Sequence, residues 1–474
     1  MDAEAAPSYN PGDISWIATS MVLVWLMVPG LGYFYSGLAS HKNALSLIMY
    51  VLVCMMVASI QWFIWGYSLT FSLGGNAILG NLDNAFLRGL LGYPSVGIDA
   101  IPDLIFCVYQ CMFQCVTAAL VVGAVAERAR LLPLMIFVFV WSTLVYNFLA
   151  YWTWNPNGWC FQLGGLDFAG GTPVHIGSGC SALAYALVVG KRIGYGKDAD
   201  PERFKAHNMS NVVLGTAFLW FGWFGFNGGS VLSSNVRLGM VLIVTNLAAA
   251  VGALTWMLMD YRVERKFSAF GFCSGAIAGL VAITPAAGFV GPGPAIALGF
   301  LGGFFCNLSL YTKRWLGFDD ALDVFSLHGV GGYVGCIFTG VFAEQYVAAL
   351  DGTEIDGGWM NQNWVQVGYQ FADATAGAAW AFCMTFIICF IMNKIPGLSL
   401  RVSEEDEIQG LDVTEIGESA YVYVNKLISV DTTTGAQITV REEIKQVNVG
   451  EHGSVHTADK IEVSTPNGTV GGVA

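Results

Sequence analysis

Long hydrophobic runs separated by short polar segments fill most of the chain. Eleven of these runs approach the ~20 residues that an α-helix needs to cross a bilayer. They occupy about 14–38, 44–72, 102–126, 132–154, 174–189, 209–227, 238–259, 269–285, 294–311, 324–342 and 367–392. The pattern predicts an all-α polytopic membrane protein with eleven transmembrane helices, and it fixes their order better than their ends.

Basic residues in the connecting segments predict the orientation. Segments after odd-numbered helices hold thirteen Lys and Arg residues, whereas the N-terminus and the other segments up to the tenth helix hold only Arg88 and Arg237. Basic loops tend to stay in the cytoplasm. We therefore expect an extracellular N-terminus (1–13), a membrane domain (14–392) and a cytoplasmic tail (393–474). No basic segment precedes the first helix, which is expected to be an uncleaved signal anchor.

Composition supports a membrane protein, because 55% of the residues are hydrophobic and only 12% are charged. The net charge of -13 comes mostly from the tail, where 13 acidic and 5 basic residues follow Leu400. No HExxH, GxSxG or Walker pattern occurs, so we expect no enzyme. The eleven cysteines form no CxxC, and no histidine accompanies Cys107, Cys111 and Cys115 on their shared helix face. We assign no metal, cofactor or nucleic-acid partner.

Two halves of the chain resemble each other. Helices one to five (about 14–190) and six to ten (about 209–342) would form two repeats, and the eleventh helix (367–392) lies outside both. An odd number of spans in each repeat gives opposite orientations, an arrangement that places a substrate site between the halves. Both repeats end in a histidine helix, DFAGGTPVHIGSG with Asp167 and His175, and DVFSLHGVGGYVG with Asp323 and His328.

The two histidines are the strongest candidates for function. His175 lies near the centre of its apolar run, where an ionisable group is costly and therefore suggests function. Loss of water favours the uncharged ring, which has one donor and one acceptor. Such a pair suits a small polar solute or a weak base better than an alkali ion. Asp167 has two interpretations: it caps N–H groups at the helix start, or it attracts a cation.

Aromatic residues gather at the outer end of helices four and six. Trp152, Trp154 and Phe226 lie there with Ser230. Aromatic rings attract small cations by roughly 0.5–2 kcal/mol, and a hydroxyl adds an acceptor. The alternative is an ordinary aromatic belt at the membrane interface.

Five separated segments carry a family resemblance: DFAGGTPVHIGSG, GWFGFNGGS, VVGAVAERAR, SGAIAGLVAITPAAGFV and DDALDVFSLHGVGGYVGCI. With them the chain resembles the ammonium transporter, methylammonium permease and Rhesus family, and is most similar to fungal high-affinity ammonium permeases. The resemblance implies a homotrimer in the plasma membrane that carries ammonium and methylammonium and serves nitrogen utilization. It also implies a transceptor role, and the alternative is a nutrient sensor whose signalling outweighs its flux.

The same resemblance assigns roles by position. It implies that His175 and His328 line the pore, that Phe113 and Phe226 form a gate, and that Ser230 belongs to an outer recruitment site. The tryptophan of that site is Trp154, with Trp152 as a competitor. Asp167 corresponds to a supporting acidic residue.

The tail resembles a regulatory segment that docks under the inner loops. We expect Arg128, Arg130, Lys205 and Arg262 to supply docking charges. Thr414 matches a regulatory threonine of plant relatives, and Ser454 lies in the distal tail. Phosphorylation by a kinase would add nearly two negative charges at either position.

Overall fold

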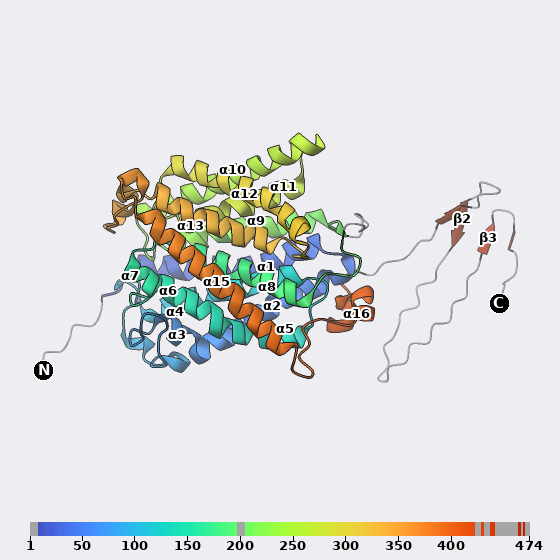
Figure 1. The fold of residues 1–474 in the computed structure, drawn as a ribbon, viewed down its shortest axis with the longest axis horizontal. Coiled ribbons are helices and arrows are strands. Elements are labelled where there is room, and N and C mark those ends of the chain that lie inside the picture. The colour runs from blue at the N-terminus through green and yellow to red at the C-terminus, as the bar shows by residue number, and fades with distance from the viewer. Residues whose placement is uncertain are drawn as a thin grey trace. The chain divides into compact units, whose positions relative to one another are not determined.

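The computed structural model describes residues 8–196, 204–421 and four short strands between 428 and 469. The chain divides into two compact units, residues 1–418 and 419–474. The first unit is helical in its described part, with hydrophobic helices running side by side (Figure 1). The boundary leaves residues 393–418 within the first unit.

The first half contains five spans, and four of them combine an α-helix with a turn of another helical type. Their elements are α1 Pro11–Leu38; α2 Ala44–Gln61, η2 Trp62–Gly66 and α3 Tyr67–Phe71; α4 Asp103–Leu120 and η5 Val121–Val125; α5 Leu131–Trp141, η6 Ser142–Tyr146 and α6 Asn147–Trp154; η7 Gly171–Ile176 and α8 Gly177–Val189. The short helix α7 Trp159–Leu163 precedes the fifth span. The turns η2, η6 and η7 are π-helical, a rare form that is frequent at functional sites.

The second half repeats this count and is followed by an additional helix. Its elements are α9 Met209–Gly229, α10 Val236–Glu264, α11 Ala269–Ile283, α12 Pro292–Leu316, η9 Phe325–Val330 with α13 Gly331–Phe342, α14 Gln345–Ala348, and the final span α15 Gln366–Met392. Within the described residues, ten helical segments are long and apolar enough to cross a membrane, and α11 is a shorter apolar one. The predicted eleven transmembrane helices are confirmed. Helices α10 and α12 extend several residues beyond the predicted ends at 259 and 311.

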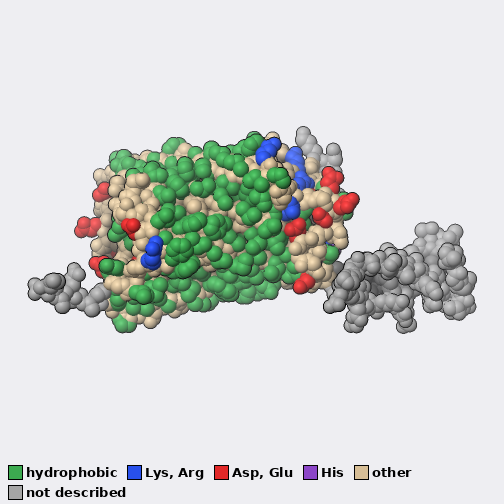
Figure 2. Space-filling view, turned by 90° about the horizontal axis from the view of Figure 1, so that it is seen from below, with side chains coloured by type: hydrophobic (Ala, Val, Ile, Leu, Met, Phe, Trp, Pro, Cys, Tyr) green, Lys and Arg blue, Asp and Glu red, His purple; other side chains and the backbone are tan. Residues whose placement is uncertain are grey.

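The two halves pack through their first helices. Helix α1 lies along α9, and Gly30 and Gly215 permit the close approach, because a Cβ on Gly215 would lie 2.4 Å from the backbone of Phe34. Small residues at helix interfaces are the usual device for such contacts in membranes. On the exterior, hydrophobic side chains cover the middle of the face in Figure 2, and charged ones gather toward its two ends. This is the surface that a bilayer requires.

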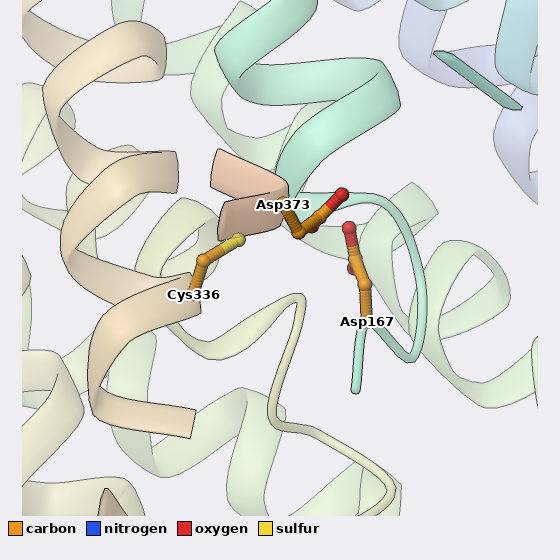
Figure 3. Close-up of side chains that lie close together, drawn as sticks. All are labelled: Asp167, Cys336 and Asp373. Atoms are coloured by element: carbon orange, nitrogen blue, oxygen red, sulfur yellow. The ribbon is translucent and has the colours of Figure 1, made fainter. Parts of the chain in front are cut away.

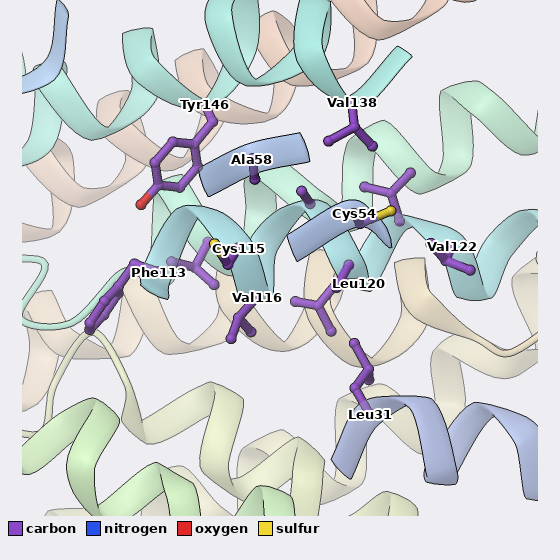
Figure 4. Close-up of a cluster of buried hydrophobic side chains, with 14 of the residues drawn as sticks. Leu31, Cys54, Ala58, Phe113, Cys115, Val116, Leu120, Val122, Val138 and Tyr146 are labelled. Carbon is purple, nitrogen blue, oxygen red and sulfur yellow. The ribbon is translucent and has the colours of Figure 1, made fainter. Parts of the chain in front are cut away.

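A hydrophobic core joins α1, α2, α4 and α5. Figure 4 shows Leu31, Cys54, Val116 and Val138 from these four helices within this cluster. All eleven cysteines lie in the described part of the chain and are free thiols, as predicted. They act as small apolar residues in the packing.

The second unit contains a small antiparallel sheet in the order β1-β2-β3-β4. Its strands are β1 Ile428–Val430, β2 Gln437–Val440, β3 Val463–Thr465 and β4 Gly468–Thr469.

Candidate functional site

Each half carries the same turn at the start of its histidine helix. His175 and His328 are 153 positions apart, and the same offset relates Asp167 to Asp320, Gly170 to Asp323, and Thr172 to Phe325. The Asp167 carboxylate accepts the N–H of Gly170, Gly171 and Thr172 at 2.7–2.8 Å. Asp320 Oδ2 accepts the Phe325 N–H at 2.7 Å. Both carboxylates thus bind free N–H groups at a helix start.

Asp323, which the second histidine motif contains, does not occupy the position of Asp167 in the first motif. Asp323 occupies the position of Gly170, and both have positive φ, 62° and 112°. Its carboxylate forms an ion pair with Lys313 rather than a cap. Asp320 takes that position, and each of the two capping aspartates precedes its histidine by eight residues.

The two capped turns bring the histidines together inside the protein. His175 Nδ1 and His328 Nδ1 are 3.2 Å apart, so one ring donates a proton and the other accepts it. Both side chains are buried. His175 stacks on Trp223 and Phe226, which fixes its ring plane. Its Nε2 atom has no hydrogen-bond partner among the described residues and is available to a solute.

Glycines at equivalent positions make this approach possible. Gly179 and Gly332 each follow a histidine by four residues. A Cβ on Gly332 would lie 2.8 Å from the Cβ of His175, and one on Gly179 would lie 2.1 Å from the Gly329 nitrogen. The helices therefore cross at glycine contacts that hold the rings at hydrogen-bonding distance.

Two stacked phenylalanines lie next to the histidines. The rings of Phe113 and Phe226 are 4.2 Å apart between centroids, and both side chains are buried. Phe226 also lies 6.1 Å from the His175 ring, while Phe113 contacts Trp154 edge-on at 5.8 Å. The phenylalanine pair thus separates the histidines from Trp154.

Beyond the phenylalanines lies a cavity of about 120 Å³, here called the Trp154 cavity. It is lined by Phe71, Val96, Gly97, Phe106, Gln110, Trp154, Phe168, Ser230 and Leu232. Ser230 donates to the Phe226 carbonyl, which leaves its oxygen as an acceptor. Trp152 does not line this cavity; its Nε1 donates to the Ile78 carbonyl, and it packs on Trp159 and Trp380. The structure therefore brings Trp154, not Trp152, to Ser230.

Gln110 is a cavity residue that sequence reasoning missed. It lies one helical turn before Phe113 in YQCMFQ, so the shared helix face could have revealed it. Its Oε1 atom is buried and has no hydrogen-bond partner in the described part of the chain. It offers a second acceptor beside Ser230.

On the histidine side of the phenylalanines, a much smaller cavity has a volume of about 10 Å³, close to the space that one water molecule needs. We call it the histidine cavity. Apolar side chains form most of its wall, and His175, His328 and Tyr35 supply the polar atoms. The Tyr35 hydroxyl donates to the Leu120 carbonyl. The space fits a small uncharged solute and offers no fixed charge to an ion.

Asp167 has a second buried carboxylate as neighbour, which the sequence analysis did not single out. Asp373 of α15 accepts the Thr172 hydroxyl, and Cys336 of α13 completes the group (Figure 3). One ligand-type atom from each of Asp167, Cys336 and Asp373 lies within 4.8 Å of the others. The Asp167 oxygens already accept three N–H groups, so we interpret this cluster as support for the turn that holds His175.

The first part of the tail docks on two helix starts and on Lys42, which donates to the carbonyls of Glu407 and Ile408. Asp412, in η12 Asp412–Ile416, accepts the N–H of Leu45 and Ser46 at the start of α2. Glu415 accepts the N–H of Leu131 at the start of α5. Exposed N–H groups and the helix dipole make these ends attractive to carboxylates.

The expected docking charges act differently. Arg128 is buried and donates to backbone carbonyls, including that of Asp319. Arg130 donates to the carbonyls of Gly397 and Ser399. Neither guanidinium forms an ion pair with a tail carboxylate in the described residues, but Arg130 holds the tail by its backbone carbonyls, so its expected docking role takes this form.

The two candidate phosphorylation positions differ in what the structure describes. Thr414 is half-buried between Asp412 and Glu415, and its hydroxyl donates to the Gly410 carbonyl. Ser454 lies outside the described residues.

The fold defines a multi-pass membrane protein in which two buried histidines and a small, mostly apolar cavity lie between the two halves. Residues 15–421 match the model of the Ammonium Transporter Family. Ammonium transporter 1 of Schizosaccharomyces pombe is 51% identical over 91% of this chain and 87% of its own length. Ammonium transporter MEP2 of Saccharomyces cerevisiae is 48% identical over 87% and 84%.

A solved structure agrees with these relatives. The crystal structure of Candida albicans Mep2 superposes with a TM-score of 0.81 at 51% identity, covering 85% of this chain and 89% of that one. The chain belongs to the Ammonium Transporter Family. The resemblance stated from the sequence motifs is confirmed.

Proposed function

We propose that this protein conducts ammonium and methylammonium across the plasma membrane. The observation that carries the proposal is the buried His175–His328 pair, held beside an aromatic gate and reached from a polar cavity. The names of the relatives, which are ammonium transporters, support the same substrate.

Recruitment takes place in the Trp154 cavity. The Trp154 ring attracts the cation, and Ser230 and Gln110 offer oxygen acceptors to its N–H groups. Asp167 lies behind this cavity, next to the lining residue Phe168, and adds negative potential. Ammonium has four N–H donors for these acceptors, whereas potassium has none.

Passage beyond the gate requires the loss of a proton, which passes to water in the Trp154 cavity and crosses the membrane separately from the ammonia. Phe113 and Phe226 must separate to admit the solute, and their apolar faces disfavour an ion that has lost its water. Ammonia can then accept or donate a hydrogen bond at His175 Nε2, since the two Nδ1 atoms are already bonded to each other. Potassium cannot shed its charge, which is the physical basis of selectivity.

Currents in proteoliposomes test this function directly. Full-length protein on a solid-supported membrane should give transient currents with ammonium and methylammonium and none with an equal potassium gradient. Equal responses to ammonium and potassium would contradict the proposal. Protein-free liposomes give the control for passive ammonia entry.

Location and assembly complete the proposal. The tail end of the first unit faces the cytoplasm, as the distribution of Lys and Arg in the loops indicates. Three copies form a trimer, which crosslinking in membranes would detect as a ladder ending at three chains. A glycosylation site engineered into residues 1–13 reports whether the N-terminus lies outside.

The docked tail provides a route to regulation. A phosphate on Thr414 would place nearly two negative charges beside Asp412 and Glu415, which hold the tail on α2 and α5. Repulsion would loosen this contact. Thr414→Asp should change the ammonium current if this segment regulates transport, and an unchanged current would oppose it.

Regulation through Ser454 and signalling are separate parts of the proposal. Removal of Asp431 to Ala474 should change transport if the distal tail contributes. A sensor role predicts that variants without transport still signal in cells, whereas a pure transporter loses both together.

A further inference from the structure

The two capping aspartates differ in how completely their oxygens are bonded. Asp167 uses both oxygens to accept three backbone N–H groups. Asp320 uses Oδ2 for the Phe325 N–H, and the Val324 N–H also faces this carboxylate. Its Oδ1 atom has no hydrogen-bond partner in the part of the chain that the structure describes, although the side chain is only 1% exposed.

The neighbouring residue, Asp319, is a carboxylate whose two oxygens both have hydrogen-bond partners. Asp319 accepts three bonds from Arg192, one from its backbone N–H and two from its guanidinium. Arg128 lies 3.9 Å from the same carboxylate. Asp319 is therefore held as an anion, and Asp320 beside it receives no such pairing.

Other groups around Asp320 come from three elements. Asp323 lies in the same turn, and Lys313 of α12 is paired with Asp323 rather than with Asp320. Tyr35 of α1 is the neighbouring hydroxyl, and Tyr195 lies beyond Lys313. Burial and the nearby Asp323 carboxylate raise the pKa of Asp320 to about 7.

Tyr35 connects this carboxyl group to the proposed path. Its ring lines the histidine cavity together with His328. Asp320 thus lies behind the cavity wall at the tail end, at the turn from which the His328 helix begins. Any charge on it acts on that end of the path.

We propose that Asp320 is a proton-binding site at the tail end of the path, in exchange with the solution on that side. Proton uptake forms one O–H bond at Oδ1 and removes one negative charge; release to water reverses both changes. This proposal rests on the proposed ammonium conduction for its effect on transport. The proton-binding itself does not depend on it.

Ammonium-evoked currents measured at matched inner and outer pH, from about 6 to 8, test the effect on transport. Ammonium remains the main species over this range. We expect the wild-type current to change with a one-proton step centred near pH 7. Asp320→Asn should lack the step, because the amide keeps the oxygen acceptor for Phe325 and cannot ionise.

Two flanking variants separate a proton site from a merely structural role. Lys313→Met removes the nearby positive charge and should move the midpoint of the step upward by about one pH unit. Asp323→Asn removes a negative charge and leaves Lys313, so the midpoint should move downward. Opposite shifts place the titrating group beside the Lys313–Asp323 pair, where Asp320 is the buried carboxyl group, and they keep the test valid if Asp320→Asn fails to fold.

Infrared spectra of the same proteoliposomes distinguish the two proposals. The absorption of protonated carboxyl groups that titrates near pH 7 should be smaller in Asp320→Asn than in the wild type. If wild-type protein gives no ammonium current but shows this difference in absorption, conduction fails and the proton site stands. If currents persist and neither the step nor the absorption depends on Asp320, the proton site is overturned while conduction stands.

Discussion

The turn before His175 and the turn before His328 have the same backbone plan but different chemistry. Asp167 is surrounded by donors, with three N–H groups on its two oxygens. Asp320 has one oxygen without a partner among the described residues. Gly170 takes the positive φ in the first turn, and Asp323, paired with Lys313, takes it in the second.

This difference shows how a repeated structure can acquire two functions. The shared parts, a capping aspartate and a glycine four residues after the histidine, are those that place the two rings at 3.2 Å. The parts that differ set the charge beside the Trp154 cavity and the charge at the tail end of the proposed path. A carboxylate with both oxygens held by N–H groups near the Trp154 cavity suits recruitment of a cation, whereas a carboxyl group with one oxygen unbonded among the described residues suits proton exchange at the tail end.

Removing each capping side chain should give the largest difference between the turns. Asp167→Ala leaves three buried N–H groups without acceptors, and each costs about 1–3 kcal/mol. We expect this variant to give little folded protein. Asp320→Ala loses fewer bonds and should remain folded with a lower melting temperature.

The stability of Asp167→Ala and Asp320→Ala is compared by heating the detergent-purified proteins and measuring the remaining folded protein by size-exclusion chromatography. Asp167→Asn provides a matched control, because it keeps an oxygen acceptor and should recover part of the stability. Equal stability of the two alanine variants would show that the turns are energetically alike.

Replacing the histidines tests whether the halves contribute equally to selectivity. The double variant His175→Ala, His328→Ala removes every polar atom of the pair, so we expect the preference for ammonium over potassium to disappear. Each single variant should lower the ammonium current by roughly tenfold, about 1.4 kcal/mol. His175→Ala should be the less stable of the two, since only His175 is stacked on Trp223 and Phe226.

The readout is the ratio of ammonium to potassium current on solid-supported membranes. His207→Ala serves as control, because this ring lies against the Ala39 carbonyl outside the path. Unchanged selectivity in the double variant would remove the basis of the proposed mechanism.

The sequence predicted the parts of this molecule that depend on local pattern. Hydrophobic runs gave the eleven spans, and the histidine motifs gave His175 and His328. Residue type alone does not show which aspartate caps the second turn. Asp323 lies in the motif of His328, but Asp320 is the counterpart of Asp167. A fixed offset of 153 between the motifs would have revealed this.

Other parts could not be read from one sequence. Asp373 and Gln110 are single polar residues in apolar helices, and only the fold shows what they face. The docking of Asp412 and Glu415 uses backbone N–H groups, which charge counting does not detect. Contacts between a side chain and a backbone group far away in the sequence therefore cannot be predicted from residue types alone.

Variants of Trp152 and Trp154 test which tryptophan belongs to the proposed recruitment site. Trp154→Leu removes a cation–π contact of roughly 0.5–2 kcal/mol, so the KM for methylammonium uptake should rise about 2- to 30-fold. Trp152→Leu removes packing on Trp159 and Trp380 and should lower stability with little change in KM. Uptake of labelled methylammonium and thermal unfolding are measured on both variants. A KM effect confined to Trp152→Leu would show that the recruitment site has been assigned to the wrong ring.

Gln110 should give the smallest effect and the finest test of the same site. Its unpartnered Oε1 faces the Trp154 cavity, and a hydrogen bond is worth about 0.5–1.5 kcal/mol net, so Gln110→Leu should raise KM roughly 2- to 10-fold. Gln114 is the matched control one turn further along α4, where its amide bonds to Gln61 and Asn147. Gln114→Leu leaves those two amides short of partners and should lower the melting temperature without raising KM. If the two variants behave alike, Gln110 supports the fold and does not bind the cation.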